Sequence, residues 1–161
     1  MEVRNKVRSI AHDLDVAKIT VVGVPDRPGI AASIFQPLAT AGISIDTIVQ
    51  NASIDSITDL TFTVAKSQLA KAMRLVGPIA ESFGARECVS DSKLGKVSII
   101  GTGMQNTPGY AARMFGALSE QGINIQLITT SEIRITCIID ETRVEDAVRA
   151  LHRVFEMEMG E

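Results

Sequence analysis

The segment Pro28-Gly29-Ile30-Ala31-Ala32-Ser33-Ile34-Phe35-Gln36-Pro37-Leu38 recurs eighty residues later as Pro108-Gly109-Tyr110-Ala111-Ala112-Arg113-Met114-Phe115-Gly116-Ala117-Leu118. The similarity continues downstream, where Gly42-Ile43-x-Ile45-x-x-Ile48 matches Gly122-Ile123-x-Ile125-x-x-Ile128. Ten of the 21 positions from 28 to 48 are identical to their counterparts, whereas chance would give roughly one or two. Two copies are too few for a solenoid, so the repeat predicts a tandem pair of domains.

The composition is typical of a globular protein and excludes several classes. Apolar residues make up 45% of the chain and charged residues 22%, which argues against disorder. The net charge of −3 and an aromatic content of 4% both argue against nucleic-acid binding, which needs basic charge and stacking side chains. No apolar run is long enough to span a membrane, and residues 1–8 do not resemble a signal peptide, so we expect a cytoplasmic protein. Cys88 and Cys137 stand far apart, which predicts buried, reduced, structural thiols.

Each copy of the repeat contains the same predicted elements. A short β-branched strand is followed by a Pro-Gly loop, a helix, two more strands and a second helix. The predicted strands are 18–23, 44–50 and 58–64 in the first copy, and 96–101, 124–130 and 133–140 in the second. We expect Pro28 and Pro108 at the first helical position, and Gly42 and Gly122 just after the helix end. Thr142-x-x-Glu145 is the signature of a capping box at the last helix.

Each copy still needs a fourth strand to complete its sheet. Residues 86–90 can supply it in the first copy, but too few residues follow the last helix to supply it in the second. A spare strand around residues 3–11 fills that place. The sequence therefore predicts an α+β fold of two ferredoxin-like βαββαβ domains, each a four-stranded antiparallel sheet with two helices on one face. The first domain, residues 17–92, is nested within the second, residues 1–16 plus 93–161.

The sequence contains no recognisable catalytic or metal-binding motif. His12 and His152 are isolated, and neither has a partner at metal-ligand spacing. Gly101-Thr102-Gly103 follows a strand but lacks the third glycine of a dinucleotide-binding loop. We therefore predict no catalytic residue, no metal and no cofactor.

The loop before each first helix is the most informative feature. Gly29 allows close approach to the backbone, and the amides after it are free donors at a helix N-terminus, which favours a carboxylate. Asp26, three residues earlier, could hold an ammonium group, so the loop has the chemistry of a receptor for a free α-amino acid. An equally good reading is that Asp26 only caps the helix and Gly29 serves the turn.

The sequence closely resembles the regulatory part of the aspartokinase family, a pair of ACT domains, and in particular the small β subunits of α2β2 aspartokinases. The resemblance covers about residues 1–157, and the segment from Asn124 to Ile135 is its most specific part. The motifs that carry it are Asp26-Arg27-Pro28-Gly29-Ile30-Ala31, Gln50-Asn51, Thr58-Asp59-Leu60-Thr61-Phe62-Thr63, Lys96-Val97-Ser98-Ile99-Ile100-Gly101-x-Gly103-Met104, Pro108-Gly109 and Asn124-Ile125-x-x-Ile128-x-Thr130-Ser131-Glu132-Ile133-Arg134-Ile135. One departure is the hairpin 52–57, which lacks the glycine common there.

The resemblance implies two effector sites. The first would bind threonine with Asp26, Gly29, Ile30, Ala31 and Gln50, together with Asn124 and Ile125 from the partner chain of a homodimer. The pseudo-equivalent second site would use Asn106, Gly109, Ala111, Thr130, Ser44 and Ile45, and it lacks the acidic residue. Ser131 matches a position where feedback inhibition in the family is sensitive to substitution.

The resemblance also implies a function. The chain would be a non-catalytic regulatory subunit that binds threonine, with lysine as a second effector, and inhibits a catalytic α subunit that phosphorylates the side chain of aspartate. The alternative is a stand-alone ACT-repeat sensor of amino acids for another enzyme.

Overall fold

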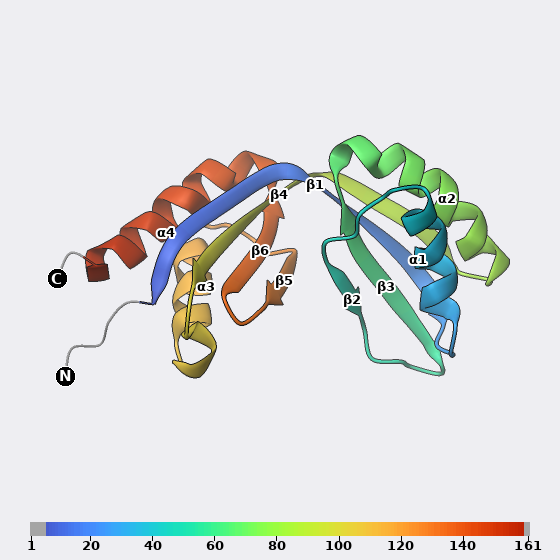
Figure 1. The fold of residues 1–161 in the computed structure, drawn as a ribbon, viewed down its shortest axis with the longest axis horizontal. Helices are drawn as coiled ribbons and strands as arrows, with labels where there is room; N and C mark the ends of the chain where they lie inside the picture. The colour runs from blue at the N-terminus through green and yellow to red at the C-terminus, as the bar shows by residue number, and fades with distance from the viewer. Residues whose placement is uncertain (1–5, 160–161) are drawn as a thin grey trace. The chain divides into compact units, whose positions relative to one another are not determined.

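The structure is a computed structural model that describes residues 6–159. It divides into two compact units (Figure 1). The inner unit is Asp15–Ser92, and the outer unit comprises the residues up to Leu14 and those from Lys93 onward. The first three residues of the strand expected at 3–11 lie outside the described residues.

The inner unit has a β-α-β-β-α-β order. It contains the second part of β1 (Val7–Pro25), α1 (Ile30–Thr40), β2 (Ile48–Gln50), β3 (Ile57–Val64), α2 (Leu69–Ser82) and the first part of β4 (Glu87–Gly101), with a 3-10 turn at Lys66–Gln68. The strand order is β2-β3-β1-β4, and β3 runs antiparallel to both β1 and β2. This is the order of a ferredoxin-like sheet.

The outer unit repeats this order with its strands taken from both ends of the sequence. It contains the rest of β4, α3 (Tyr110–Glu120), β5 (Leu127–Thr130), β6 (Arg134–Asp140), α4 (Val144–Met159) and the first part of β1, with 3-10 turns η2 (Met104–Asn106) and η3 (Glu141–Arg143). The strand order is β1-β4-β6-β5. The predicted α+β class, the two ferredoxin-like repeats and the nested order are therefore confirmed.

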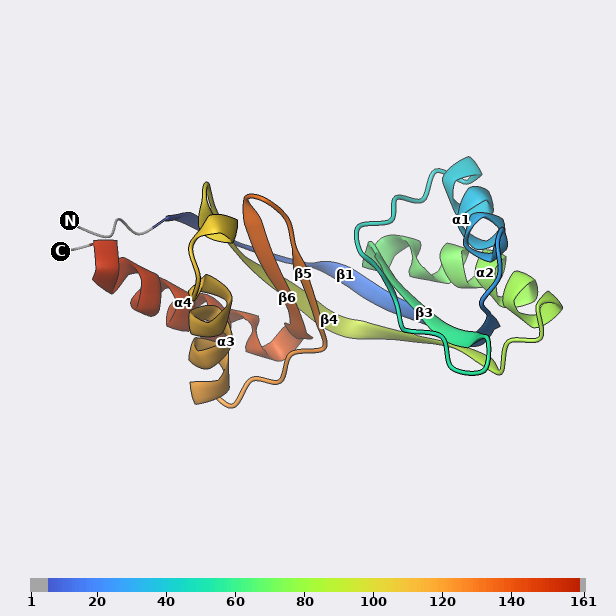
Figure 2. The ribbon, with the colours of Figure 1, turned by 90° about the horizontal axis from the view of Figure 1, so that it is seen from below.

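Both helices of each unit cover the same face of its sheet (Figure 2). In the inner unit the buried residues Ile19 and Phe62 from the sheet belong to one core with Ile34 and Val76 from the helices. The outer unit has a matching core, which includes Val97, Ile99, Cys137, Ile139, Met114, Leu118 and Leu151. Alternate strand residues point to the helices, as expected for sheets with one covered face.

The strands differ in length from the predicted ones. β1 is one continuous strand of 19 residues, where the sequence suggested two short strands. No glycine or proline stands between residues 9 and 22, so nothing local interrupts the extended backbone. β2 and β5 are shorter than predicted because they begin only at Ile48 and Leu127.

The residues at which the helices begin also differ from the predicted ones. The helices begin after Gly29 (φ 91°) and Gly109 (φ 104°), so the expectation that Pro28 and Pro108 are first helical residues is wrong. The capping box at Thr142 is also wrong, because Asp140 Oδ1 accepts the Thr142 backbone N–H at 2.8 Å and caps the turn η3 instead. The hydrogen bond from the Thr142 hydroxyl and, next, the one from its backbone N–H lower the pKa of Asp140. Gly42 and Gly122 do follow their helices with positive φ, as predicted.

Neither cysteine forms a disulfide. Cys137 is buried, as predicted, whereas Cys88 is only half-buried. Among residues 6–159, no helix combines the length and apolar character needed to cross a bilayer.

Gly101→Ala should destabilise the protein by about 1–3 kcal/mol, because a Cβ at this position would collide with the backbone carbonyl of Lys6. Gly116→Ala is the matched control, because a Cβ there meets nothing within 4 Å and alanine favours the helix by about 0.5–1 kcal/mol. Thermal melting of both variants checks the prediction, and equal melting temperatures would contradict it.

Cys137 should not react with a thiol reagent in the folded protein. Burial raises its pKa to about 12 and also raises the pKa of Cys88, so little of the reactive thiolate forms near neutral pH. Titration of Cys88→Ser and Cys137→Ser with a chromogenic disulfide, before and after denaturation, separates the two thiols. Rapid labelling of native Cys88→Ser would contradict the prediction.

Candidate functional site

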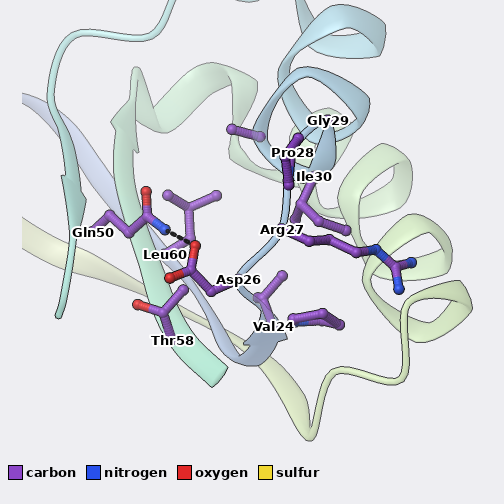
Figure 3. Close-up of a pocket in the computed structure, with 11 residues that line it drawn as sticks. Val24, Asp26, Arg27, Pro28, Gly29, Ile30, Gln50, Thr58 and Leu60 are labelled. Atoms are coloured by element: carbon purple, nitrogen blue, oxygen red, sulfur yellow. Dashed lines mark hydrogen bonds between the residues drawn. The ribbon is translucent and has the colours of Figure 1, made fainter. Parts of the chain in front are cut away.

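The loop between β1 and α1 forms one wall of a pocket of about 410 Å³ in the inner unit (Figure 3). The opposite wall comes from the end of β2 and the start of β3. The pocket is lined by Val24, Pro25, Asp26, Arg27, Pro28, Gly29, Ile30, Ala31, Gln50, Thr58 and Leu60.

Backbone hydrogen bonds position the loop before the helix begins. The pairing of β1 with β3 shifts register between Val21 and Val24, and Gly23 lies there with φ 73°. The Gly23 N–H donates to Asp59 Oδ1 at 3.0 Å, and the Asp26 N–H donates to the Ser56 carbonyl at 2.8 Å. The bulge therefore redirects the chain from the sheet into the pocket wall.

Polar side chains meet in the pocket. Gln50 Nε2 donates to Asp26 Oδ1 at 3.4 Å, so β2 and the loop are joined across the pocket. Figure 3 shows Asp26 and Gln50 pointing toward one another, while the guanidinium of Arg27 points away from both. A carboxylate can accept several hydrogen bonds, so Asp26 retains capacity for a cationic donor.

Asp26 does not cap α1. The N-cap is Gly29, which has no side chain, and no side chain accepts a hydrogen bond from the first turn. The Ser33 amide is the first to bond back to Gly29, at 3.0 Å. The helix N-terminus therefore faces the pocket with its positive dipole end and without a side-chain cap, which excludes the alternative reading of Asp26.

The floor of the pocket is apolar. Val24, Ile30 and Leu60 are almost completely buried, at 1%, 7% and 4% exposure. Thr58 is also buried, and its hydroxyl donates to the Asn51 carbonyl at 2.7 Å. The pocket thus combines a carboxylate, an amide, an uncapped helix start and a small apolar floor.

The corresponding loop of the outer unit forms a second pocket, of about 530 Å³. It is lined by Met104, Gln105, Thr107, Pro108, Gly109, Tyr110, Ala111, Thr130, Ser131, Glu132 and Ile135. Tyr110 replaces Ile30 at the first helical position, and its buried hydroxyl accepts the Lys6 backbone N–H at 2.8 Å. Here too the N-cap glycine leaves the helix start without a side-chain cap.

The two loops differ in length. Residues 18–23 match 96–101 at a shift of 78, whereas Pro28-Gly29 match Pro108-Gly109 at a shift of 80. The two extra residues of the outer loop are accommodated by the turn η2, which ends at Asn106. Three residues before its N-cap glycine the outer loop has Asn106 in place of an aspartate, so the second pocket has no counterpart of the Asp26 carboxylate at this place.

Some of the predicted site residues line one of the two pockets, and others line neither. Asp26, Gly29, Ile30, Ala31 and Gln50 all line the first pocket, and Gly109, Ala111 and Thr130 line the second. Asn106 lies between the lining residues Gln105 and Thr107 but does not line the second pocket. Ser44 and Ile45 belong to the inner unit, Asn124 and Ile125 belong to the outer unit, and none of these four lines either pocket.

Several lining residues were missed by sequence reasoning, among them Thr58, Leu60, Tyr110 and Glu132. Strand pairing would have found some of them, because Gln50 pairs with Leu60 in the same way as Thr130 pairs with Ile135. Ser131, predicted only as a position that affects regulation, lies in the second pocket. No group of three or more potential metal ligands occurs among residues 6–159.

Comparison with known proteins identifies the repeat. The ACT domain family model matches residues 19–77 and 97–155. The solved regulatory subunit of aspartate kinase from Thermus thermophilus, in its ligand-free form, is 41% identical, with a TM-score of 0.88, and the match covers 93% of this chain and 99% of that one. The chain belongs to the family of ACT-domain regulatory chains of aspartate kinase.

Other relatives of the chain belong to the same family. The solved structure of aspartokinase alpha and beta subunits contains a chain with 41% identity and a TM-score of 0.86, with the same coverage. The aspartate kinase of Pseudomonas fluorescens is 49% identical over 152 residues. The match covers 94% of this chain but only 37% of that kinase, so the regulatory chain spans little more than a third of the curated relatives it matches.

Proposed function

We propose that this regulatory chain binds threonine in the pocket of the inner unit and couples its occupancy to feedback inhibition of aspartate kinase. The observation that carries the proposal is the Asp26 carboxylate beside the uncapped N-terminus of α1 in a single pocket. These two groups are complementary to the ammonium and carboxylate of a free α-amino acid.

The remaining pocket walls suit a small hydroxylated side chain. The Gln50 amide offers a donor and an acceptor to a hydroxyl, and Val24, Ile30 and Leu60 offer an apolar contact to a methyl group. Threonine carries both groups on one carbon. The same zwitterion-binding groups would admit lysine, which we propose as a second effector of the assembled enzyme.

A homodimer would complete the site. Asp26 and Gln50 are exposed in the single chain, so a bound ammonium group would remain partly solvated. β2 and β5 are edge strands, and their matching residues Ile48 and Ile128 are 55% and 46% exposed. Such open apolar edges favour pairing with another sheet. We propose that a second copy covers the pocket and contributes Asn124 and Ile125.

The proposed partner in the complete enzyme is a catalytic α chain. The similar solved structure of aspartokinase alpha and beta subunits supports this arrangement. Regulation of lysine, threonine and methionine biosynthesis in the cytoplasm follows from the same proposal. The second pocket, with Gly109, Ala111 and Thr130, would be a weaker threonine site because it lacks the carboxylate of Asp26.

Asp26→Ala should weaken threonine binding by about 30-fold or more, because the ligand ammonium loses its counter-charge. Titration calorimetry with threonine, and with lysine in parallel, measures the effect. Glu81→Ala is the matched control: it also removes one exposed carboxylate from the inner unit but does not line the pocket, so affinity should stay close to that of the parent.

Asn106→Ala should have a smaller effect than Asp26→Ala, because Asn106 does not line the second pocket and an amide binds an ammonium less strongly than a carboxylate does. Circular dichroism melting of all three variants controls for misfolding. Loss of binding in Asn106→Ala, with parent-like binding in Asp26→Ala, would mean that the second pocket is the principal site.

Threonine should promote dimerisation, since a site shared by two chains links ligand binding to association. Sedimentation velocity across a concentration series, with and without saturating threonine, measures the monomer fraction. Serine and alanine serve as ligand controls, and a monomer fraction that threonine leaves unchanged would contradict a site shared between chains.

A further inference from the structure

The hairpin that connects β2 to β3 in the inner unit has an unusual turn. Among residues 6–159, Asp55 and Ser56 are the non-glycine residues with positive φ, at 54° and 60°. Ile54 and Ile57 exchange two backbone hydrogen bonds of 3.0 Å across them, which closes a two-residue turn. Two left-handed residues make this a type I′ turn, a geometry in which glycine is preferred because a side chain is strained there.

This strained turn holds the pocket loop. The Ser56 carbonyl accepts the Asp26 N–H at 2.8 Å, and the base of the hairpin is closed by the Thr58 hydroxyl bonded to the Asn51 carbonyl at 2.7 Å. The tip itself packs little against the rest of the chain, because Ile54 is 75% exposed. A strained turn with few buried contacts is a segment that opens locally at low cost.

The described residues of the outer unit contain no such turn. There β5 and β6 are joined by three residues, and the Ser131 N–H bonds directly to the Arg134 carbonyl at 2.8 Å. The Asn106 N–H bonds to the Gly103 carbonyl within its own turn, at 3.3 Å. Asn106 is therefore held locally, whereas Asp26 is held by a hairpin about thirty residues away in the sequence.

We propose that the hairpin Asn51–Thr58 positions Asp26 in the pocket, and that the left-handed residues Asp55 and Ser56 determine how often Asp26 is released. Closure of the turn orients the Asp26 backbone and so directs its carboxylate toward Gln50. Opening of the turn removes the acceptor of the Asp26 N–H. The consequence for an amino-acid ligand rests on the proposed function, but the coupling between turn and loop is independent of it.

Amide hydrogen exchange in the free protein tests the coupling. Ser56→Gly removes the side-chain strain but keeps the carbonyl. The Asp26 amide should therefore exchange about fivefold more slowly, a ratio that corresponds to the typical free-energy cost of one left-handed non-glycine residue. Ser56→Pro fixes φ near −65°. It therefore cannot keep the turn, and exchange at Asp26 should become at least tenfold faster. The Gly23 amide, bonded to Asp59, is the internal reference and should not change.

Ser53→Gly is the matched control, because it makes the same chemical change in the same hairpin at a residue without positive φ. It should not slow exchange at Asp26. Equal Asp26 exchange in the parent, Ser56→Gly and Ser56→Pro would overturn the proposal, as would equal slowing by Ser53→Gly.

A threonine titration of the same variants tests the effect on the site. Ser56→Pro should weaken binding about tenfold or more, since only the fraction with a closed turn is competent. Parent-like affinity in a Ser56→Pro protein with rapid Asp26 exchange would overturn the positioning role. If the parent itself does not bind threonine, the proposed function fails, and the exchange measurements still decide whether the hairpin controls Asp26.

Discussion

The antiparallel neighbours β1 and β4 are the constraint on which both units depend. Each strand is long enough to contribute to two sheets, and the Arg86 N–H bonds to the Val22 carbonyl at 2.8 Å as they come together. Close contact requires a small residue at Gly101, where a side chain would strike the Lys6 carbonyl just before β1. On the same strand, a side chain at Gly95 would strike Val144 of α4. Each strand also ends in the loop that carries one of the two pockets. The same pairing therefore completes the sheets and places the loops.

Within each unit, the glycine that precedes the first helix connects the fold to its chemistry. Gly29 and Gly109 adopt a left-handed conformation that turns the chain from loop to helix without supplying a capping side chain. The helix start is left to be satisfied by water or by a ligand. In the inner unit a carboxylate, Asp26, stands beside it. The duplicated fold thus provides a helix start without a side-chain cap twice, and the local sequence decides what else surrounds it.

The two copies diverge in the segments that surround their pockets. The inner pocket has a short loop with Asp26 and a long hairpin that reaches it through Ser56. The outer pocket has a longer loop, a three-residue connection between β5 and β6, and Tyr110 where the inner unit has Ile30. In the inner pocket these differences provide the carboxylate of Asp26, whose backbone is held by the turn at Ser56. In the outer pocket they provide neutral polar groups together with the side chain of Glu132. Changes in the loops therefore allow the two pockets of one repeated fold to differ in the groups that line them.

The sequence alone determined the repeat, the α+β class, the nested order and five of the eleven residues that line the first pocket, because periodicity and the Pro-Gly loops depend on local chemistry. It could not determine that β1 is one continuous strand, since strand continuity depends on pairing with distant segments. It also left open whether Asp26 caps α1. Only the tertiary structure decided this, by placing Gly29 at the N-cap and Gln50 beside the carboxylate. Thr58, Leu60 and Ser56 join the pocket or its loop through strand register and a turn, which are long-range features that no local pattern contains.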